Sequence, residues 1–349
     1  MSLLWGDVPM VLVSPPAITP DNIEEVYKLY FPDRQPQLDV FRQVAEDLEW
    51  AALNAPAVNT TDKFKLSKAV AYGLLARVYA EKPIRNYEKV KEACTAVEAM
   101  NLSLVTNFSD LWSYNTEKTD MVARHSSESI FEVPFTKSQG NWVWMMFWRN
   151  GIGDNPNDSF SWQKWNTPSQ NLIAHFQREG DNVRMNQTII WDECGWSTYY
   201  PAENYPFMYK CRCNASSIIR MRLAEIYLLH AEALAQTGDL SGAAGYVNRV
   251  RNRVSLGNLP ASASASKENM IDAILDERRL ELAFEGHRLF DLIRLDKAIE
   301  CVHGLNTVGS RYYDALKPTI TKIDERGLIM PVPEKQLDNN PNISQNPGY

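Results

Sequence analysis

The sequence lacks any long apolar run. Its 349 residues contain no stretch close to the ~18 consecutive apolar residues that a membrane-spanning helix needs. The first residues also lack the charged and apolar regions of a secretory signal peptide. With 44% apolar residues, the composition is that of a globular protein with a sizeable core.

A surplus of basic residues is also missing. The chain carries 36 Lys and Arg against 43 Asp and Glu, which gives a formal net charge of −7. Nucleic-acid-binding domains present clustered positive charge to the phosphate backbone, and no basic stripe runs along this sequence. The charge balance therefore argues against a nucleic-acid partner.

The common motifs of enzymes are absent as well. The sequence contains no G-x-S-x-G, no phosphate-binding loop and no dinucleotide fingerprint. The adjacent acids Asp192 and Glu193 have diverging side chains, and a pair such as Asp154 and Asp158 arises by chance in any acidic protein. We therefore expect no catalytic residues and no enzymatic activity, with a glycoside hydrolase as the least favoured alternative.

Metal-ligand spacing is missing too. The five histidines are isolated: His230 is predicted to be a hydrogen-bonded core residue, and His287 has no second histidine at ligand spacing. Cys211 and Cys213 are close together but lack the second pair of a zinc site. Cys194 is a candidate disulfide partner for either of them, and the sequence leaves this open. No metal or cofactor is predicted.

What the sequence does contain is helical periodicity, most clearly in residues 218–295. A first helix is predicted to end at Gly238, and Ser241 is the expected N-cap of a second. Two helices joined by a short turn predict an αα-hairpin of the tetratricopeptide kind. The apolar positions at helical spacing are Ile219, Leu223, Ile226, Tyr227, His230 and Leu234 in the first helix, and Ala243, Tyr246, Val247 and Val250 in the second.

A third helix follows residues 254–266, whose small side chains indicate a flexible linker. Its apolar stripe contains two charges, Arg278 and Glu285. Because an unpaired buried charge is very costly, we expect both to be partly buried and ion-paired. The wider set of charges is predicted to form a structural ion network and not a catalytic cluster: Glu277, Arg278, Arg279, Glu281, Glu285 and Arg288.

The N-terminal part predicts a second group of helices. Residues 4–18 are expected to be extended, and Thr19 is expected to cap a first helix. A longer helix is predicted over residues 38–54, followed by an αα-hairpin over residues 66–80 and 87–100. Two hairpins far apart in sequence predict a helical-repeat scaffold, although the ~34-residue tetratricopeptide consensus is not kept.

Residues 141–196 differ from the rest because they hold seven of the ten tryptophans, interleaved with Asn, Asp, Gln and Arg. An indole ring stacks on the apolar face of a sugar, while planar polar side chains bond to its hydroxyl rim. Most of these tryptophans are expected to pack loops onto helices, including Trp148 and Trp191, which lie in apolar runs. The ligand-binding candidates are those with polar or small neighbours: Trp142, Trp144, Trp162, Trp165, Trp196, Tyr199, Asn141 and Arg149.

Several motifs, taken in order, resemble the SusD/RagB family of nutrient-binding lipoproteins. They are LWGDVPMVL, LSKAVAYGLLARVYAEKPIRNYEKVKEAC, ESIFEVPF, ILDERRLELAFEGHRLFDLIR and the tail LIMPVPEKQLDNNPNISQNPGY. Each is weak alone, but the ordered set is specific and covers nearly the whole chain. Family members begin with an export signal, a lipid-bearing cysteine and further helices, so the resemblance implies that this chain is N-terminally truncated.

The resemblance implies a mainly α fold, with a SusD-like scaffold of tetratricopeptide-like hairpins, long aromatic-rich loops and small β pieces. It implies a single domain over residues 1–349. Its expected parts are first helical hairpins at 19–115, an aromatic-rich ligand face at 116–215, a main helical block at 216–300 and an irregular C-terminal segment at 301–349. Strands are expected at residues 129–135 and 327–333, with the tail pinned against the body.

The function implied by the same resemblance is that of a surface-exposed lipoprotein of the outer membrane in Bacteroidetes. Such a protein captures oligosaccharides without chemistry and hands them to a SusC-like TonB-dependent transporter. Two alternatives stay open: capture of peptides, as in the RagB branch, and a helical-repeat interaction module without a small ligand.

Overall fold

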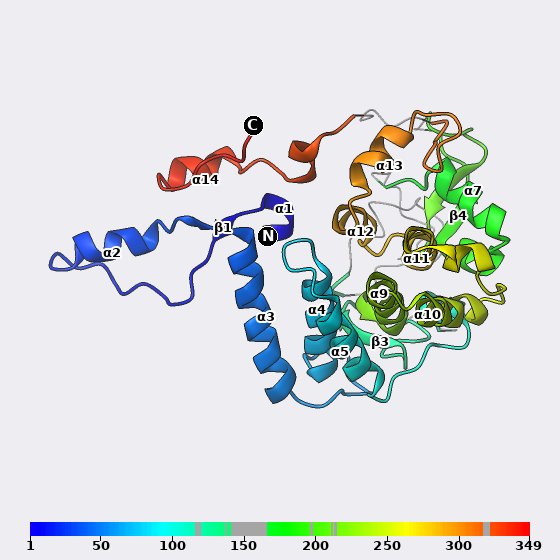
Figure 1. Ribbon diagram of the computed structural model, residues 1–349, viewed down its shortest axis with the longest axis horizontal. Helices are drawn as coiled ribbons and strands as arrows, with labels where there is room; N and C mark the ends of the chain where they lie inside the picture. The colour runs from blue at the N-terminus through cyan, green and yellow to red at the C-terminus, as the bar shows by residue number, and fades with distance from the viewer. Residues whose placement is uncertain are drawn as a thin grey trace.

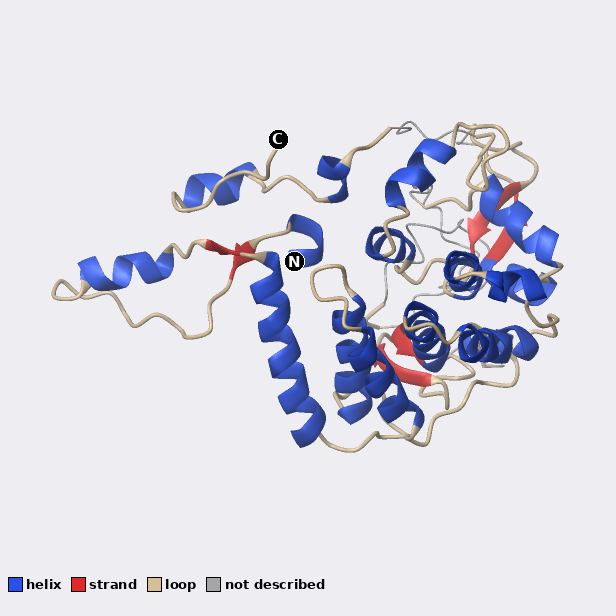
Figure 2. Ribbon diagram, in the orientation of Figure 1, coloured by secondary structure: helices blue, strands red, loops and turns tan. Residues whose placement is uncertain are grey.

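The computed structural model describes residues 1–115, 120–136, 138–140, 166–195, 198–210, 212, 215–316 and 322–349. Helices dominate it, and the short strands form small two-stranded sheets (Figure 2). The expected mainly α fold is therefore confirmed. In this described part of the chain, no helix is both long enough and apolar enough to cross a membrane.

The scaffold is a set of packed helices from two distant parts of the chain: α3 (Gln37–Asn54), α4 (Lys68–Ala80), α5 (Tyr87–Glu98), α9 (Leu223–Gln236), α10 (Leu240–Arg253) and α11 (Lys267–Glu281). Both predicted hairpins are present, as α4–α5 and α9–α10, and they adjoin each other through α5 and α9 (Figure 1). α3 packs on α4, and α11 packs on both α9 and α10. Contacts between distant segments therefore hold the two hairpins as one scaffold.

Small and branched apolar side chains fill the contacts between these helices. Ala69 and Val97 are completely buried in the core shared by α3, α4, α5 and α9. Val247 and Ile274 are completely buried between α9, α10 and α11. Small side chains let neighbouring helix axes approach closely. The apolar face predicted for the second helix of the α9–α10 hairpin is thus confirmed.

The helix predicted from Ile218 begins later than expected. Ile218–Arg222 is strand β6, which pairs antiparallel with β3 (Ser129–Val133), and α9 starts at Leu223. The strand predicted near residue 129 is confirmed, whereas Ile219 lies in a strand and not on a helix face. Ile219 fits the helical spacing of α9 by chance. The sequence pattern does not show that the backbone of residues 218–222 pairs with a distant strand.

Two helix starts also differ from the predictions. α2 (Ile23–Tyr30) has Asn22 as its N-cap, and the backbone N–H of Thr19 donates to the Asn22 side chain at 2.7 Å. α10 is capped by Asp239, which accepts the N–H of Gly242 at 2.8 Å, so Ser241 is not the cap. Asp239 marks the start of α10, because its side chain accepts a free N–H group of the first helical turn.

Residues 254–266 are not a flexible linker. The side chain of Asn248 on α10 accepts the N–H of Leu259 at 2.8 Å. The segment then forms the 3₁₀ helix η2 (Ala261–Ala265), and Ala263 is buried against α10 and α11. Its small residues allow the segment to pack closely on the helices. Flexible linkers are also rich in small residues, so composition alone does not distinguish the two cases.

The C-terminal segment runs back along the N-terminal arm, where α14 lies beside α2 and β1 (Figure 1). Residues 327–333, predicted as a strand, hold the end of a 3₁₀ helix and then extended chain, whose backbone bond to the N-terminal segment runs from Met330 N–H to the Leu4 carbonyl at 2.6 Å. The missing N–H groups of two prolines there prevent a full strand pairing. The pinned tail is confirmed, since the Arg34 guanidinium donates to the Ser344 carbonyl and to Asn346. The elements of this segment are α12 (Arg288–Arg294), α13 (Ala298–Gly304), η3 (Glu325–Leu328) and α14 (Glu334–Asn339).

The remaining short elements include a helix and a β-hairpin within the region expected to be rich in loops. The helix is α7, and Ser169 caps it by accepting the N–H of Leu172. The segment after it was expected to be loop, but it forms a helix and the two strands of a β-hairpin. The bounds are α1 (Ser2–Trp5), β1 (Val8–Pro9) paired with β2 (Arg34–Gln35), η1 (Phe108–Leu111), α7 (Gln170–Glu179), α8 (Asn182–Thr188), and β4 (Ile189–Asp192) paired with β5 (Tyr205–Met208).

Candidate functional site

Most of the predicted ligand-binding residues lie outside the described residues: Trp142, Trp144, Trp162, Trp165, Trp196, Asn141 and Arg149. The same holds for Trp148, Asp154, Asp158, Cys211 and Cys213. Tyr199 is described; it lies between β4 and β5 and is 58% exposed. Among the predicted residues, Tyr199 is thus the one whose accessibility the structure describes.

Trp191, which was expected to pack in the core, is 38% exposed on β4. Its neighbour Ile190 packs in an aromatic cluster, and Ile189 packs against α7. A two-stranded sheet covers its residues unevenly along the strand, so an apolar run does not reveal which positions are covered. The expectation of a core role for Trp191 is wrong.

An aromatic cluster holds the chain that directly follows Trp165 in the sequence. Tyr205 and Phe207 of β5 are buried with ring centroids 5.0 Å apart, and the Tyr200 ring meets Tyr205 edge-on at 5.5 Å. The Tyr205 hydroxyl lies 2.9 Å from Thr167 Oγ1, and the Tyr200 hydroxyl donates to the Pro168 carbonyl at 2.7 Å. These contacts fix the position of the chain just before α7.

A cavity of about 460 Å³ opens beside this anchored segment, between the start of α7, the end of α11, and α12. We call it the α7–α12 cavity. Its volume lies in the range of about 300–1,000 Å³ that is usual for small-molecule sites. Apolar side chains form much of its wall, among them Leu172, Leu282, Phe284 and Phe290. A cavity with apolar walls and a few polar groups can hold a small organic ligand in a defined orientation.

The turn after α11 adopts an unusual backbone conformation where it lines this cavity. Phe284 has a φ of +64°, and Gly286 has a φ of +86°. A non-glycine residue in this left-handed region costs about 1–2 kcal/mol. The buried carboxylate of Glu285 holds the turn, since it accepts from Lys210 and from Arg222 at 2.7 Å. The turn ends α11 before Glu285, which was predicted to continue the helix, and places Phe284 in the cavity wall.

Two guanidiniums in the cavity wall make no salt bridge with a described residue. Arg279 donates to the Asn171 side chain, and Arg288 donates to the Leu275 carbonyl at 3.2 Å. Burial and the nearby charge of Arg288 lower the pKa of Arg279 to about 10. Both were predicted to belong to the ion network, which is wrong for these two. Their other N–H groups are left to bind acceptors such as hydroxyl or carboxylate oxygens.

The predicted ion network does exist around the neighbouring carboxylates. Glu281 is fully buried and accepts from Arg222, from Arg253 and, at 3.0 Å, from Arg184. Arg222 and Arg253 also donate to Glu128 at 2.8 and 2.6 Å. Burial alone would raise the pKa of Glu281, but the Arg253, Arg222 and Arg184 guanidiniums outweigh it and hold that pKa well below its usual range. The network joins α11 to β6, α10, α8 and the start of β3.

A second group of buried charges joins α11 to α12 and α9. Arg278 makes two bonds of 2.8 Å to the Asp291 carboxylate, and Arg294 bonds to Asp291 and to Glu232. The prediction that Arg278 is buried and paired is confirmed. Glu81 lies 3.7 Å from Arg294. Burial raises the pKa of Glu81 to about 7, because the opposing charge of Arg294 is offset by Glu232 and Asp291.

The histidines and cysteines that the structure describes form no recognisable metal site, and no group of three or more His, Cys, Asp or Glu suited to a metal occurs in those parts of the chain. His230 is buried with its Nδ1 2.7 Å from Glu98 Oε1, as predicted. His287 Nδ1 lies 3.6 Å from Glu225, and burial lowers the pKa of His287. Cys194 is a buried free thiol, so the disulfide left open for it is not formed.

Comparisons with known proteins agree with the fold. A sequence model of the SusD family matches residues 208–349. SusD-like protein P38 of Formosa agariphila is 26% identical in an alignment that covers 99% of this chain and 70% of that protein. The starch-binding protein SusD of Bacteroides thetaiotaomicron is 29% identical over 37% of this chain and 21% of its own length. A solved laminarin binding SusD-like protein has a TM-score of 0.70 at 23% identity, covering 100% of this chain and 75% of that chain. The family match over residues 208–349, the relatives and the shared fold agree with the ordered motifs and support membership of this chain in the SusD/RagB family.

Proposed function

We propose that this protein binds glycans at the cell surface without chemically altering them. In this proposal it is a lipid-anchored protein of the outer membrane, and it delivers oligosaccharides to a SusC-like TonB-dependent transporter. Two relatives support a carbohydrate ligand, since one is named a starch-binding protein and another a laminarin binding protein.

One observation supports the proposal most directly: residues 166–169, which directly follow Trp165 in the sequence, line the α7–α12 cavity. Sugars present an apolar C–H face and a rim of hydroxyls, which match the phenyl rings of Phe284 and Phe290 and the N–H groups of Arg279 and Arg288. We propose that the tryptophans and polar residues predicted from the sequence complete this site, together with Tyr199.

The cavity also supports a binding role over a hydrolytic one. Glycoside hydrolysis requires two carboxyl groups on either side of the scissile bond. Asp291 is the one carboxylate among the described residues that line this cavity, and it is paired with Arg278 and Arg294. A carboxylate held ionised by two guanidiniums is a poor proton donor.

The test is isothermal calorimetry and tryptophan fluorescence of the full chain with a panel of α-glucans, β-glucans and other oligosaccharides, with a peptide mixture alongside. Saturable binding of one glycan class is the expected result. At least one of the following substitutions should weaken it by about tenfold, or ~1.4 kcal/mol: Trp142→Ala, Trp144→Ala, Trp162→Ala, Trp165→Ala and Trp196→Ala. Trp50→Ala is the matched control, because Trp50 lies on α3 and is 68% exposed.

Three outcomes would count against the proposal. Binding of peptides and of no glycan would favour the peptide-uptake alternative. Glycan binding that all five substitutions leave unchanged would place the site elsewhere. Release of shortened glycan products by the purified protein would show catalysis.

A further inference from the structure

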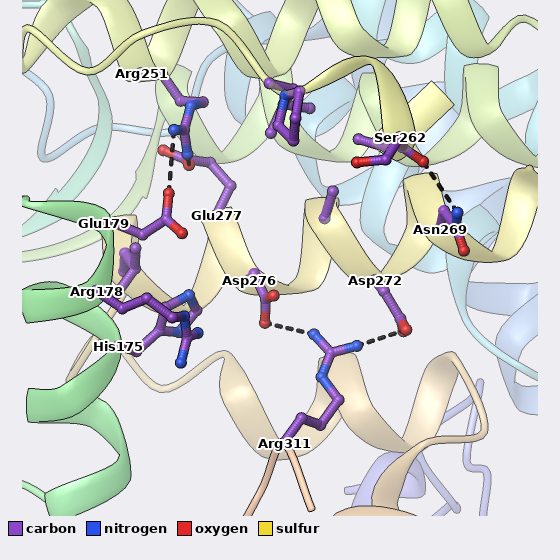
Figure 3. Close-up of a pocket in the computed structure, with 15 residues that line it drawn as sticks. His175, Arg178, Glu179, Arg251, Ser262, Asn269, Asp272, Asp276, Glu277 and Arg311 are labelled. Atoms are coloured by element: carbon purple, nitrogen blue, oxygen red, sulfur yellow. Dashed lines mark hydrogen bonds and ion pairs between the residues drawn. The ribbon is translucent and has the colours of Figure 1, made fainter. Parts of the chain in front are cut away.

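A second cavity, of about 500 Å³, lies between α7, α10, η2 and α11 (Figure 3). No described residue lines both this cavity and the α7–α12 cavity. We call it the His175 cavity, after the buried histidine in its wall. Nothing in the proposed glycan site uses this cavity, so its polar side chains need an explanation of their own.

The His175 imidazole is the first reason to expect a ligand here. The side chain projects from α7 into the cavity wall and is 3% exposed. Neither ring nitrogen makes a hydrogen bond with any residue that the structure describes. Burial and the positive charges of Arg279 and Arg178 lower the pKa of His175 to about 3. The ring is therefore neutral at ordinary pH and offers one donor and one acceptor, neither of which is bonded to a described residue.

A donor or an acceptor in a buried ring carries a cost wherever it lacks a partner. A buried polar group without a partner costs about 1–3 kcal/mol relative to a bonded one. A hydroxyl group is a natural complement to a neutral imidazole, because a hydroxyl also both donates and accepts. The ring thus favours a ligand, or ordered water, that carries hydroxyl groups.

Arg178 provides a second unpaired group beside the ring. It follows His175 by one turn of α7, and Figure 3 shows both side chains extending from α7 toward α11. Its guanidinium is exposed and makes no bond to another described residue. Five N–H donors next to the neutral imidazole can bind two adjacent oxygen atoms at once.

Ion pairs hold the other walls in place and leave acceptors toward the cavity. Asp276 uses one carboxylate oxygen to bind Arg311 at 2.7 Å, and Glu179 uses one to bind Arg251 at 3.1 Å (Figure 3). The second oxygen of each carboxylate makes no bond with another described residue. The formal charges of the lining nearly balance, with three positive side chains and four negative ones: Arg178, Arg251 and Arg311 against Glu179, Asp272, Asp276 and Glu277. This balance favours a neutral ligand over an anion or a cation.

We propose that the His175 cavity is a second ligand site, which binds a neutral, polyhydroxylated ligand of the size of a small sugar unit through hydrogen bonds. The cavity holds no aromatic side chain besides His175 among its described lining residues, so recognition there is by hydrogen bonding and not by stacking. That the ligand is a sugar rests on the proposed function. A glycan bound at both cavities would gain a second point of attachment.

The test observes the His175 ring directly in the full chain labelled with ¹⁵N-histidine. The five histidines give few ring signals, and His175→Gln identifies the one of interest by its loss. Glucose, galactose, mannose and the oligosaccharides of the calorimetric panel are the probes. We expect a saturable shift of the His175 ring nitrogens, at a pH where the ring stays neutral before and after binding. Arg178→Met should weaken this response at least fivefold, and the neighbouring Gln177→Ala, on the exposed side of α7, should not.

The outcomes separate this inference from the proposed function. A silent His175 signal at sugar concentrations that saturate the calorimetric binding would overturn the second site and leave the proposed function standing. A His175 shift in a protein whose tryptophan variants bind normally would support the second site and contradict the first. If no sugar binds in either measurement, both are wrong. An equal response in wild type and Arg178→Met would also overturn the site as described, since Arg178 is exposed and its loss should not unfold the protein.

Discussion

Replacing Glu281 by glutamine tests whether the buried ion network holds the scaffold together. Glutamine keeps nearly the same shape but removes a full negative charge from beside Arg222, Arg253 and Arg184. Breaking a buried pair from one side costs about 3–5 kcal/mol, because the remaining charge is left without compensation. Each of the three arginines keeps at least one other carboxylate, so we expect the lower end, about 3 kcal/mol.

This loss converts to a measurable shift in the thermal midpoint. The entropy of unfolding is ~2.1 cal/mol/K per residue, which for 349 residues is about 0.7 kcal/mol/K. A loss of about 3 kcal/mol therefore lowers the Tm by about 4 °C. Calorimetry and urea unfolding of the wild type and Glu281→Gln would measure it. The pKa of Glu281 in the folded protein lies well below that of a glutamate in the unfolded chain. The stabilisation that the Glu281 carboxylate provides is therefore fully present above the unfolded pKa. It is lost only as the pH falls through the folded pKa. The difference should thus be constant from about pH 6 to 8.

Glu268→Gln is the matched control, because it makes the same change on the same helix. Glu268 is 79% exposed and lies 3.7 Å from Lys297, so its replacement should change the stability by less than about 0.5 kcal/mol. If Glu281→Gln behaved like this control, the network would be dispensable, and our account of how α11 is anchored would be refuted.

Two further predictions concern the turn after α11 and a buried acid. Gly286→Ala should destabilise the protein by about 1–2 kcal/mol, because Gly286 has a φ of +86° although space around it is open. Gly245→Ala, in the exposed interior of α10 with equally open space, should instead stabilise it by about 0.5–1 kcal/mol; urea unfolding of both separates backbone strain from crowding. Glu81 has a pKa raised to about 7 in the folded protein, so the folded state binds the extra proton and stability should fall as the pH rises from the unfolded pKa through 7. Glu81→Gln should flatten this pH dependence, and an unchanged slope would show that another group causes it.

The local features of this fold follow from sequence periodicity to a large extent. Apolar spacing predicted five helices close to their observed places: α3, α4, α5, α10 and α11. An amphipathic stripe can be recognised in this way because it depends only on residues three or four positions apart. The pairing of Arg278 and the hydrogen bond of His230 could also be predicted, since a buried charge or polar ring needs a partner. The sequence did not identify those partners, which come from distant helices.

Other features depend on contacts that no local pattern contains. Ile218–Arg222 fits a helical spacing but became a strand because β3 supplies its backbone hydrogen bonds. The residues after Val254 have the composition of a linker but are held by α10 and α11. In both cases the free energy of a long-range contact outweighs a weak local preference.

For the candidate sites, the sequence by itself determined the kinds of residue present and the family to which their order belongs. It did not show that the third helix ends before Glu285, nor that Phe284 enters a cavity wall there. The tertiary structure alone decided that Arg279 and Arg288 make no salt bridge among the described residues, whereas the adjacent Arg278 pairs with Asp291. It also alone decided that the His175 ring is buried and that neither of its nitrogens bonds to a described residue. The physical reason is that a charge or a ring in a sequence can be paired by any residue in the chain, and only the folded chain brings a particular partner, or an open cavity, within hydrogen-bonding distance.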